Sequence, residues 1–529
     1  MSAHTHDSVP PVLIAGAGPS GLALALWLAR SGIHPRIIER EPARPATSRA
    51  IAVQARTLEF YRQLGIADEV IAHGLPLDAL NFWVDGRKVT RLPFGELARG
   101  KSPYPFILML AQDQHEALLE QALARAGVTV ERGVTLENFE QGQHGIQAQL
   151  ALPDGRRELC EARYLAGCDG ARSLVRHGLK AAFPGGTYAH LFYVADLDAV
   201  GPGADGELHV ALDQAGILAA FPLKNDTPAA PGEGRVRLIG TVRTAPAEGE
   251  GSAAASFTWD DVDKAALGRV GLTVRDVRWF STYHVHHRVV DRFRDGPVFL
   301  VGDAAHIHSP VGGQGMNTGL GDAVNLAWKL AEVLHGRAPA TLLDSYAPER
   351  RAFATRLVAT TDRLFQIVTR DGELARWVRT RVFPNVVPRV FDSARGRTYL
   401  FATVSQTRIQ YRHGPLSEGH GGGLRAGDRW PWIPGGEGQE DSFAPLGERR
   451  WQAFVYGGPS AALGDVRAVC GRRGISVHLS PWRPEAEAAR LERDAFYLVR
   501  PDGYVGFADG RLHPDAVDDY LSRHCAPAT

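Results

Sequence analysis

Three glycines near the start of the chain have the spacing of a dinucleotide-binding turn. Gly16, Gly18 and Gly21 follow the apolar run 12–15 and lead directly into a pattern rich in alanine and leucine. A strand, a tight turn and a helix in this order let the backbone approach a diphosphate, whose charge the helix N-terminus favours. An ordinary strand–helix turn that merely contains glycines is the alternative. The candidate cofactor contacts here are Gly16, Gly18, Pro19, Ser20 and Gly21.

An acidic residue at the end of the next predicted strand adds to this pattern. Glu39 follows the apolar segment 35–38 and lies 18 positions after Gly21, near the spacing of about 20 for a carboxylate that binds a ribose 2′-hydroxyl. A carboxylate would repel a 2′-phosphate, so the sequence predicts bound FAD or NAD rather than NADP. Arg40, the next residue, is a further candidate contact.

Two later segments repeat the pattern of a strand that ends in polar residues. Asp169 and Gly170 follow the apolar run 164–167, a place where α/β sheets put ligand contacts, although Asp-Gly is also a common turn pair. A second apolar strand ends at Gly302 and Asp303, and a glycine-rich loop and a long amphipathic helix follow. We expect Asp303 to accept a sugar-chain hydroxyl and the loop backbone to lie against a planar ligand.

Two more polar residues are placed near these motifs. Arg49, in the loop after the first nucleotide-binding unit, could reach a pyrophosphate or form a surface salt bridge. Gln112 stands just before a predicted helix, for which Asp113 and Glu116 have the spacing of a capping box.

Composition excludes several classes of protein. Lys+Arg and Asp+Glu both total 59, so no net charge would recruit nucleic acid or an anionic membrane. Glycines and a proline interrupt the charge-free stretch 11–29, and the first ten residues lack a basic segment, which argues against a membrane span or signal peptide. Four scattered cysteines without C-x-x-C argue against a disulfide framework and fit a reducing cytoplasm. His284, His286 and His287 lack nearby partners for a ligand set, so no metal is predicted.

With these motifs in order, the chain resembles the class A flavoprotein monooxygenases, the para-hydroxybenzoate hydroxylase and phenol hydroxylase type. The resemblance covers roughly residues 10–400. It rests on the glycine fingerprint with Glu39, on the motif of Asp169, Gly170, Ser173 and Arg176, and on the motif of Gly302, Asp303, Pro310, Gly313, Gly315 and Asn317.

The resemblance implies roles for individual residues. Glu39 would hold the adenosine ribose, Arg49 and Gln112 would contact the FAD phosphates and ribityl chain, and Asp303 would bind the ribityl chain. The backbone amides of Met316 and Asn317, beside Gly313 and Gly315, would face the pyrimidine edge of the isoalloxazine. Pro310 would lie over the flavin, near where oxygen and substrate meet.

The resemblance also implies the reaction. NADH or NADPH would reduce FAD, O2 would add at flavin C4a, and the terminal oxygen atom of this C4a-hydroperoxyflavin would be transferred to an aromatic, phenolic or polycyclic substrate. Tyr193, Tyr283, His284 and His286 are candidates for a base that ionises a phenol. Relatives often carry an acid where this chain has 51–53, Ile-Ala-Val, which argues against a simple-phenol mechanism. Epoxidation, halogenation or reduction on the same fold, and a flavin-binding sensor, are the alternatives.

The implied fold is α/β: a Rossmann-type FAD-binding domain, an inserted mainly antiparallel substrate sheet and a C-terminal thioredoxin-like domain. Without C-x-x-C, the last domain would be structural, and it would support a homodimer or cap the catalytic body. The expected segments are 8–80, 109–182 and 291–411 for the FAD-binding domain, 81–108 and 183–290 for the substrate sheet, 412–441 for a linker and 442–529 for the thioredoxin-like domain.

Overall fold

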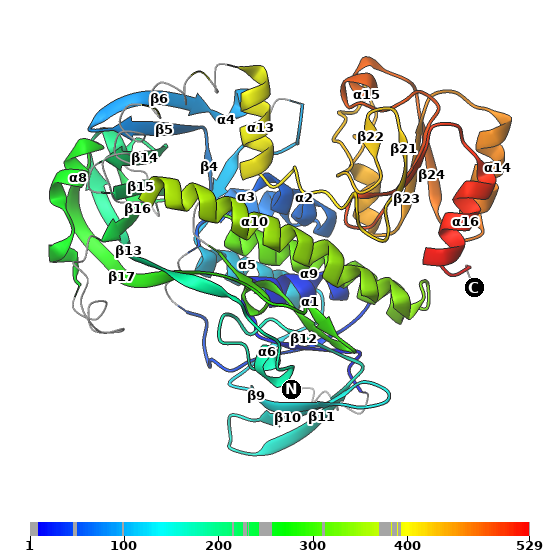
Figure 1. Cartoon of the computed structure of the whole chain (residues 1–529), viewed down its shortest axis with the longest axis horizontal. Coiled ribbons are helices and arrows are strands. Elements are labelled where there is room, and N and C mark those ends of the chain that lie inside the picture. Colours follow the sequence, from blue (N-terminus) through cyan, green and yellow to red (C-terminus); the bar gives the residue numbers. More distant parts are fainter. Residues whose placement is uncertain are drawn as a thin grey trace.

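A computed structural model of the chain contains a parallel sheet covered by helices, a long antiparallel sheet beside it and a separate C-terminal sheet (Figure 1). The structure describes residues 9–45, 50–97, 100–213, 216–225, 230, 232–242, 257–308, 313–369, 382, 389 and 393–527.

The parallel sheet places the ends of distant segments at one edge. Its strand order is β18-β19-β12-β1-β2-β8, and β1 pairs in parallel with both β12 and β2. Its strands are β1 (Val12–Ala15), β2 (Arg36–Glu39), β8 (Val130–Arg132), β12 (Tyr164–Gly167), β18 (Arg294–Asp295) and β19 (Val298–Leu300). Since parallel strands end at a common edge, the residues after β1, β2, β12 and β19 lie near one another.

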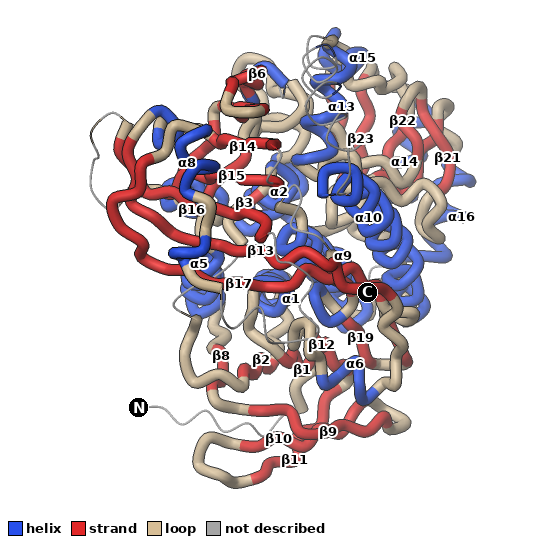
Figure 2. Tube along the Cα trace, turned by 60° about the vertical axis from the view of Figure 1, so that its left-hand side comes forward, coloured by secondary structure: helices blue, strands red, loops and turns tan. Residues whose placement is uncertain are grey.

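Helices and a small sheet cover the two faces of this sheet (Figure 2). Helices α1 (Pro19–Arg30), α5 (Gln112–Arg125) and α9 (Gly315–Leu334) pack on one side. On the other side lie β9 (Thr135–Gln141), β10 (Ile146–Ala151) and β11 (Arg157–Ala162). Strand β1 is buried throughout, as is α1 from Gly21 to Ala29. Burial in this sandwich explains why the stretch 11–29 carries no charge. Among the described residues, no helix is long and apolar enough to span a bilayer.

The antiparallel sheet is built around two long strands, β13 (Gly185–Val200) and β17 (Thr273–Val289). Its order is β20-β17-β13-β16-β15-β14-β5-β6. The shorter strands are β5 (Ala79–Val84), β6 (Arg87–Pro93), β14 (Leu208–Asp213), β15 (Gly216–Leu223), β16 (Glu233–Val242) and β20 (His306–Ile307). β5 and β6 therefore extend the inserted sheet, whereas β20 joins it to the segment that follows Asp303.

Shorter elements connect these sheets. A small sheet contains β3 (Ala52–Val53), β4 (Leu75–Leu77) and β7 (Ile107–Met109). The other helices of the catalytic body are α2 (Ala55–Leu64), α3 (Ala67–His73), α4 (Phe94–Leu97), α6 (Leu174–Gly178), α8 (Lys264–Arg269), α10 (Tyr346–Thr369) and α13 (Ala394–Val404). The predicted capping box of α5 is wrong: Ala111 occupies the N-cap without a side-chain bond, and Asp113 lies inside the first turn.

The C-terminal unit is a six-stranded sheet of order β22-β21-β26-β25-β23-β24. Its elements are β21 (Glu418–Gly421), β22 (Leu424–Arg425), β23 (Gln452–Tyr456), α14 (Ala461–Gly471), β24 (Ser476–Ser480), α15 (Pro484–Ala488), β25 (Phe496–Val499), β26 (Val505–Asp509) and α16 (Pro514–His524). Part of the expected linker thus belongs to this sheet. Trp430 is fully buried and stacks on Phe454 with ring centroids 4.7 Å apart, so this segment also supplies core.

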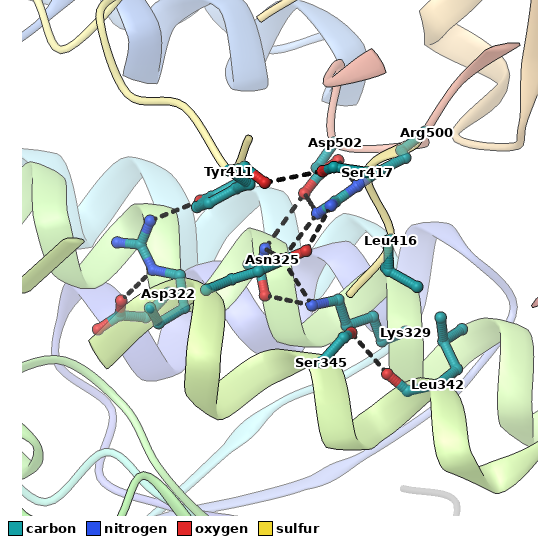
Figure 3. Close-up of polar contacts among 12 residues, drawn as sticks. Asp322, Asn325, Lys329, Leu342, Ser345, Tyr411, Leu416, Ser417, Arg500 and Asp502 are labelled. Carbon is teal, nitrogen blue, oxygen red and sulfur yellow. Dashed lines mark hydrogen bonds and ion pairs between the residues drawn. The ribbon is translucent and has the colours of Figure 1, made fainter. Parts of the chain in front are cut away.

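Buried charges join the C-terminal unit to the catalytic body (Figure 3). Glu349 of α10 binds Lys329 of α9 at 2.8 Å and Arg500 at 2.6 Å, and Arg500 also binds Asp502 at 2.6 Å. All four side chains are at most 1% exposed. Burial alone would raise the pKa of Glu349, but the two cations lower it to about 2. Removing one partner would leave the other buried charges without a counter-charge in a low-dielectric interior.

We therefore expect Glu349→Gln to lower the free energy of unfolding by about 3–5 kcal/mol at neutral pH, the cost of breaking a buried pair. The matched control is Glu418→Gln, which breaks a pair with Arg523 whose side chains are 36% and 53% exposed, and it should cost about 1 kcal/mol or less. Chemical denaturation measures the free energy of unfolding of both variants, and equal losses would contradict a stabilising role for the buried Glu349 pair.

The same pair has a predictable pH dependence. The pKa of Glu349 is lower in the folded chain than its ordinary 4.5, so its stabilisation is complete above that pH and is lost as the pH falls toward 2. The stability difference between the native chain and Glu349→Gln should narrow over that window.

Candidate functional site

The carboxyl edge of the parallel sheet gathers the predicted nucleotide-binding residues. Ala15 is the register partner of Gly167 and of Ile38, and Gly167 is in turn the partner of Leu300. The residues that follow these positions are Gly16, Glu39, Asp169 and Asp303. Four segments that are far apart in the sequence therefore meet at one edge of the sheet, the edge at which α/β sheets bind ligands.

The glycine turn combines close packing with one open position. Gly16 has φ +103°, and a Cβ there would lie 2.4 Å from the carbonyl oxygen of Cys168. A Cβ on Gly21 would lie 2.0 Å from the carbonyl oxygen of Gly16. By contrast, a Cβ on Gly18 would meet nothing within 4 Å. Packing therefore requires glycine at Gly16 and Gly21, whereas Gly18 leaves space in front of the N-terminus of α1.

Ser20 has a packing role that its position in the motif does not reveal. A Cβ added to Gly302 would lie 2.6 Å from the Ser20 hydroxyl oxygen, and one added to Gly319 would lie 2.3 Å from it. Side-chain-free positions on the Gly302 turn and on α9 thus let both segments approach α1. The glycine turn and the later glycine-rich segment are thereby held at a fixed separation.

Glu39 lies over the glycine turn. Its carboxylate accepts hydrogen bonds from the amides of Ala17 at 2.8 Å and Glu41 at 3.1 Å. Arg40 is 63% exposed at its side chain and pairs with Glu41 at 3.3 Å, so it lies at the rim. Arg49, a predicted phosphate contact, lies outside the described residues.

Asp169 has one oxygen that the described protein leaves unsatisfied. Its Oδ2 accepts the amide of Val175 at 3.1 Å at the start of α6, whereas its buried Oδ1 has no hydrogen-bond partner. Arg176 donates to the carbonyl of Ala304 at 3.0 Å and so ties this motif to the Gly302 turn. A buried orphan acceptor fits a ligand that donates a hydroxyl. Asp303 is exposed.

The N-terminus of α9 presents backbone donors, and one side chain anchors it. Asn317, 1% exposed, accepts the amide of Gln54 at 3.0 Å and donates to the carbonyls of Ala52 at 2.8 Å and Gly313 at 3.0 Å. The first helical bond of α9 is Thr318 N–H to Gln314, so the amides from Gly315 to Asn317 precede its ladder. The sequence predicted the backbone of Asn317 as a contact but missed the structural role of its side chain.

Buried polar groups support the same helix end from below. His115, fully buried, lies 2.6 Å from the hydroxyl of Tyr61 and 3.4 Å from the sulfur of Met316. Burial lowers the pKa of His115 to about 4, so the ring is neutral near pH 7. The side-chain amide of Gln112 donates to the Glu116 carboxylate at 2.8 Å, and the backbone N–H of Gln112 donates to the carbonyl of Ala50.

The structure separates the four candidate bases onto two faces of the antiparallel sheet. Tyr193 is 5% exposed and stacks on Phe257 and Phe280, in a core on the outer face. Tyr283 is the register partner of Phe192, and their ring centroids lie 5.9 Å apart. Both lie on the opposite face of the sheet, the inner face, which also carries Asp196 and Arg237. Side chains alternate along a strand, so neighbouring positions cannot share a site.

The two histidines belong with neither tyrosine cluster. His284 is exposed, and Nδ1 of His286 lies 2.8 Å from the hydroxyl of Thr187. Burial, together with Arg288 and the other histidines, lowers the pKa of His286. Val285, between them, is buried in the cluster that contains Tyr283, so both histidines face away from that cluster. Pro310 lies outside the described residues.

A pocket lies between the start of α5 and the inner face of the antiparallel sheet. Its lining residues are Met109, Leu110, Ala111, Asp113, Gln114, Asp196, Leu223, Lys224, Arg235 and Arg237. Arg237 is 2% exposed, forms two hydrogen bonds of 2.7 Å to Asp196 and donates to the carbonyl of Ala50 at 3.3 Å. This ion pair was not predicted from the sequence, where its only signal is opposite charge on two predicted strands.

The chain has relatives of known type. Residues 10–361 match the FAD binding domain family. The 6-methylpretetramide 4-monooxygenase of Streptomyces rimosus is 35% identical over 94% of this chain and 90% of that protein. The pentachlorophenol 4-monooxygenase of Sphingobium chlorophenolicum is 32% identical over 79% and 75%. The structure of an anhydrotetracycline hydroxylase from Streptomyces rimosus superposes with a TM-score of 0.75 at 29% identity, covering 98% of this chain and 100% of that one.

The chain therefore belongs to the FAD binding domain family, and it is a FAD-dependent monooxygenase of the aromatic hydroxylase type. This confirms the class, the enzyme activity and the flavin predicted from the three sequence motifs.

The open position at Gly18 gives a direct test of where the diphosphate lies. Gly18 has φ −72°, which alanine adopts freely, and its Cβ would meet no protein atom. We expect Gly18→Ala to leave the apoprotein as stable as the native chain but to weaken FAD binding about tenfold or more, because the methyl occupies the approach of the diphosphate.

The matched control for this change is Gly464→Ala in α14, which also meets nothing within 4 Å. Both variants are measured by FAD fluorescence quenching and by thermal unfolding of the apoprotein. Unchanged FAD affinity in Gly18→Ala would contradict the placement.

Proposed function

We propose that the enzyme hydroxylates a polycyclic, phenolic aromatic compound with NADH or NADPH as reductant. The observation that carries the proposal is the pocket between α5 and the inner face of the antiparallel sheet. A ligand there would meet the apolar residues Met109, Leu110 and Leu223 as well as charged ones. The names of two relatives, a 6-methylpretetramide 4-monooxygenase and an anhydrotetracycline hydroxylase, support a substrate of this class.

The crevice residues fit FAD along its length. Glu39 would hold the adenosine ribose, the space at Gly18 would admit the diphosphate, and the orphan Oδ1 of Asp169 would accept a hydroxyl together with Asp303. The amides of Met316 and Asn317 would face the pyrimidine edge, where a helix N-terminus stabilises negative charge. Bound there, FAD supplies the activation of O2, and the chain supplies binding, orientation and exclusion of water.

Arg49, Gln112 and Pro310 keep the roles that the family resemblance implies. Gln112 stands at the start of α5 beside the pocket residue Ala111 and is oriented by Glu116. Burial raises the pKa of Glu116, which favours its protonated form.

On the substrate side, Tyr283 is the candidate acid–base residue that the geometry favours. It shares the inner face with Phe192 and Asp196 of β13 and with Arg237 of the neighbouring strand β16. Tyr193, His284 and His286 face elsewhere and are better explained by packing or exposure.

The reductant needs no second nucleotide domain. The sequence contains one dinucleotide fingerprint, so the nicotinamide would bind transiently at the open pocket. Lys224 and Arg235 line it and could attract an anionic cofactor or substrate.

The C-terminal unit supports a thioredoxin-like assignment. β23, α14 and β24 form a parallel βαβ unit, and the antiparallel strands β25 and β26 and helix α16 follow. The residues that the structure describes there contain no cysteine pair for redox work, since Cys470 and Cys525 are both buried and reduced. We propose a structural role for this unit and, with its outer surface, a homodimer.

The proposed reaction is tested with purified, yellow protein. We expect a polycyclic phenol to stimulate NADH or NADPH oxidation and to yield a product carrying one atom from ¹⁸O2. Rapid oxidation that forms only H2O2 across phenols, naphthols and fused polyketide-like aromatics would contradict the hydroxylase proposal, and a flavin that NAD(P)H never reduces would favour a sensor.

Asp303→Ala tests the proposed ribityl contact. A hydrogen bond to a charged group contributes about 1.5–3 kcal/mol, so FAD affinity should fall about 10- to 100-fold. Asp344→Ala, whose side chain is 70% exposed in the same domain, is the control. The 450 nm absorbance per mole of purified protein reports both, and a value like that of the native chain in Asp303→Ala would refute the contact.

A further inference from the structure

A chain of buried hydrogen bonds runs from the C-terminal unit to the flavin crevice. At the crevice end of this chain is Gly302, whose amide donates to Oδ2 of Asp322 on α9 at 3.0 Å. Nε2 of His306 lies 2.6 Å from the same oxygen, and Oδ1 accepts from Arg350 of α10 at 2.5 Å. Asp322 is fully buried. One carboxylate therefore fixes both ends of the turn 302–306.

Arg350 continues the chain outward. It is 1% exposed, and its remaining nitrogens donate to the hydroxyl of Tyr411 at 2.8 Å and to the carbonyl of Thr318 at 3.0 Å. Burial alone would raise the pKa of Asp322, but Arg350 and His306 lower it, so the carboxylate stays charged. Burial raises the pKa of Tyr411, so its hydroxyl stays protonated. All three guanidinium nitrogens thus have defined partners.

Tyr411 is placed by the C-terminal unit (Figure 3). Its ring packs on that of Tyr504 with centroids 4.5 Å apart, and Arg500 lies 5.2 Å from it. Its amide donates to the carbonyl of Gly427 at 2.7 Å. Both Tyr504 and Gly427 belong to the segment that forms the C-terminal sheet and its lead-in.

We infer that Arg350 is a positioning residue of the flavin site and that the C-terminal unit sets its position through Tyr411. The unit thus acts on the catalytic body by holding the Gly302 turn through Arg350 and Asp322. The inference rests on the proposed placement of FAD at Gly302 and Asp303.

A second contact route supports this coupling. Arg56, 2% exposed at the start of α2, donates to the carbonyl of Asp502 and binds Glu59 at 2.8 Å. The preceding residue segment 52–54 is the one anchored by Asn317. The C-terminal unit therefore contacts residues that support two parts of the proposed flavin site, the Gly302 turn and the start of α9.

The test compares Tyr411→Phe with Tyr520→Phe. Each removes one buried hydroxyl: that of Tyr411 accepts from Arg350, whereas that of Tyr520 donates to the carbonyl of Leu416 and has no link to Asp322. We expect Tyr411→Phe to weaken FAD binding about three- to tenfold, and Tyr520→Phe to leave it unchanged at a similar loss of apoprotein stability. Equal FAD affinity in the two variants would overturn the inference.

Two further arms separate the inference from the proposal on which it rests. In an Asp322→Asn background, Tyr411→Phe should cause no further loss of FAD affinity, because the coupled path is already broken; full additivity would count against the path. If Asp303→Ala weakens FAD binding while Tyr411→Phe behaves like Tyr520→Phe, only the coupling fails. If Asp303→Ala also has no effect, both the placement and the coupling fail.

Discussion

The structure depends on backbone contacts that leave no room for a side chain. Strand β1, helix α1 and helix α9 approach one another at Gly16, Gly21, Gly302 and Gly319, where an added Cβ would fall within 2.0–2.6 Å of another atom. Such contacts are rigid, since backbone and a packed serine cannot move aside. They fix the width of a crevice at the carboxyl edge of the parallel sheet, and the one open glycine, Gly18, lies in front of it.

Buried charge then holds the elements around this crevice. Asp322, Arg350, Glu349, Lys329 and Arg500 are all essentially inaccessible to water. Ionic groups of this kind stabilise less than an apolar core would, but they tolerate few alternative arrangements. Their position between α9, α10 and the C-terminal sheet connects the C-terminal unit to the catalytic body.

The sequence could predict that the residues of the candidate nucleotide site meet at one sheet edge, because their signals are local. A glycine turn between a strand and a helix, and an acid at the next strand end, have fixed spacings, and the parallel sheet brings them together. Contacts that depend on register could not be predicted in this way. Tyr193 and Tyr283 looked equivalent in sequence, yet one residue of register separates the outer core from the inner face.

Contacts between residues far apart in the sequence could not be predicted either. The pairing of Asp196 with Arg237 and of Asn317 with the segment 52–54 links residues that only the folded sheet places together. The segment 412–441 looked like a glycine-rich linker, but part of it pairs with β26, because short strands with little apolar alternation give no clear pattern.

The most direct test of the account is a crystal structure with FAD bound. The account predicts the diphosphate against the open side of Gly18, a flavin-chain hydroxyl on Oδ1 of Asp169, and the isoalloxazine at the N-terminus of α9. A flavin bound elsewhere, or a crevice between Gly16 and Gly302 that is closed by side chains in the holoenzyme, would contradict it.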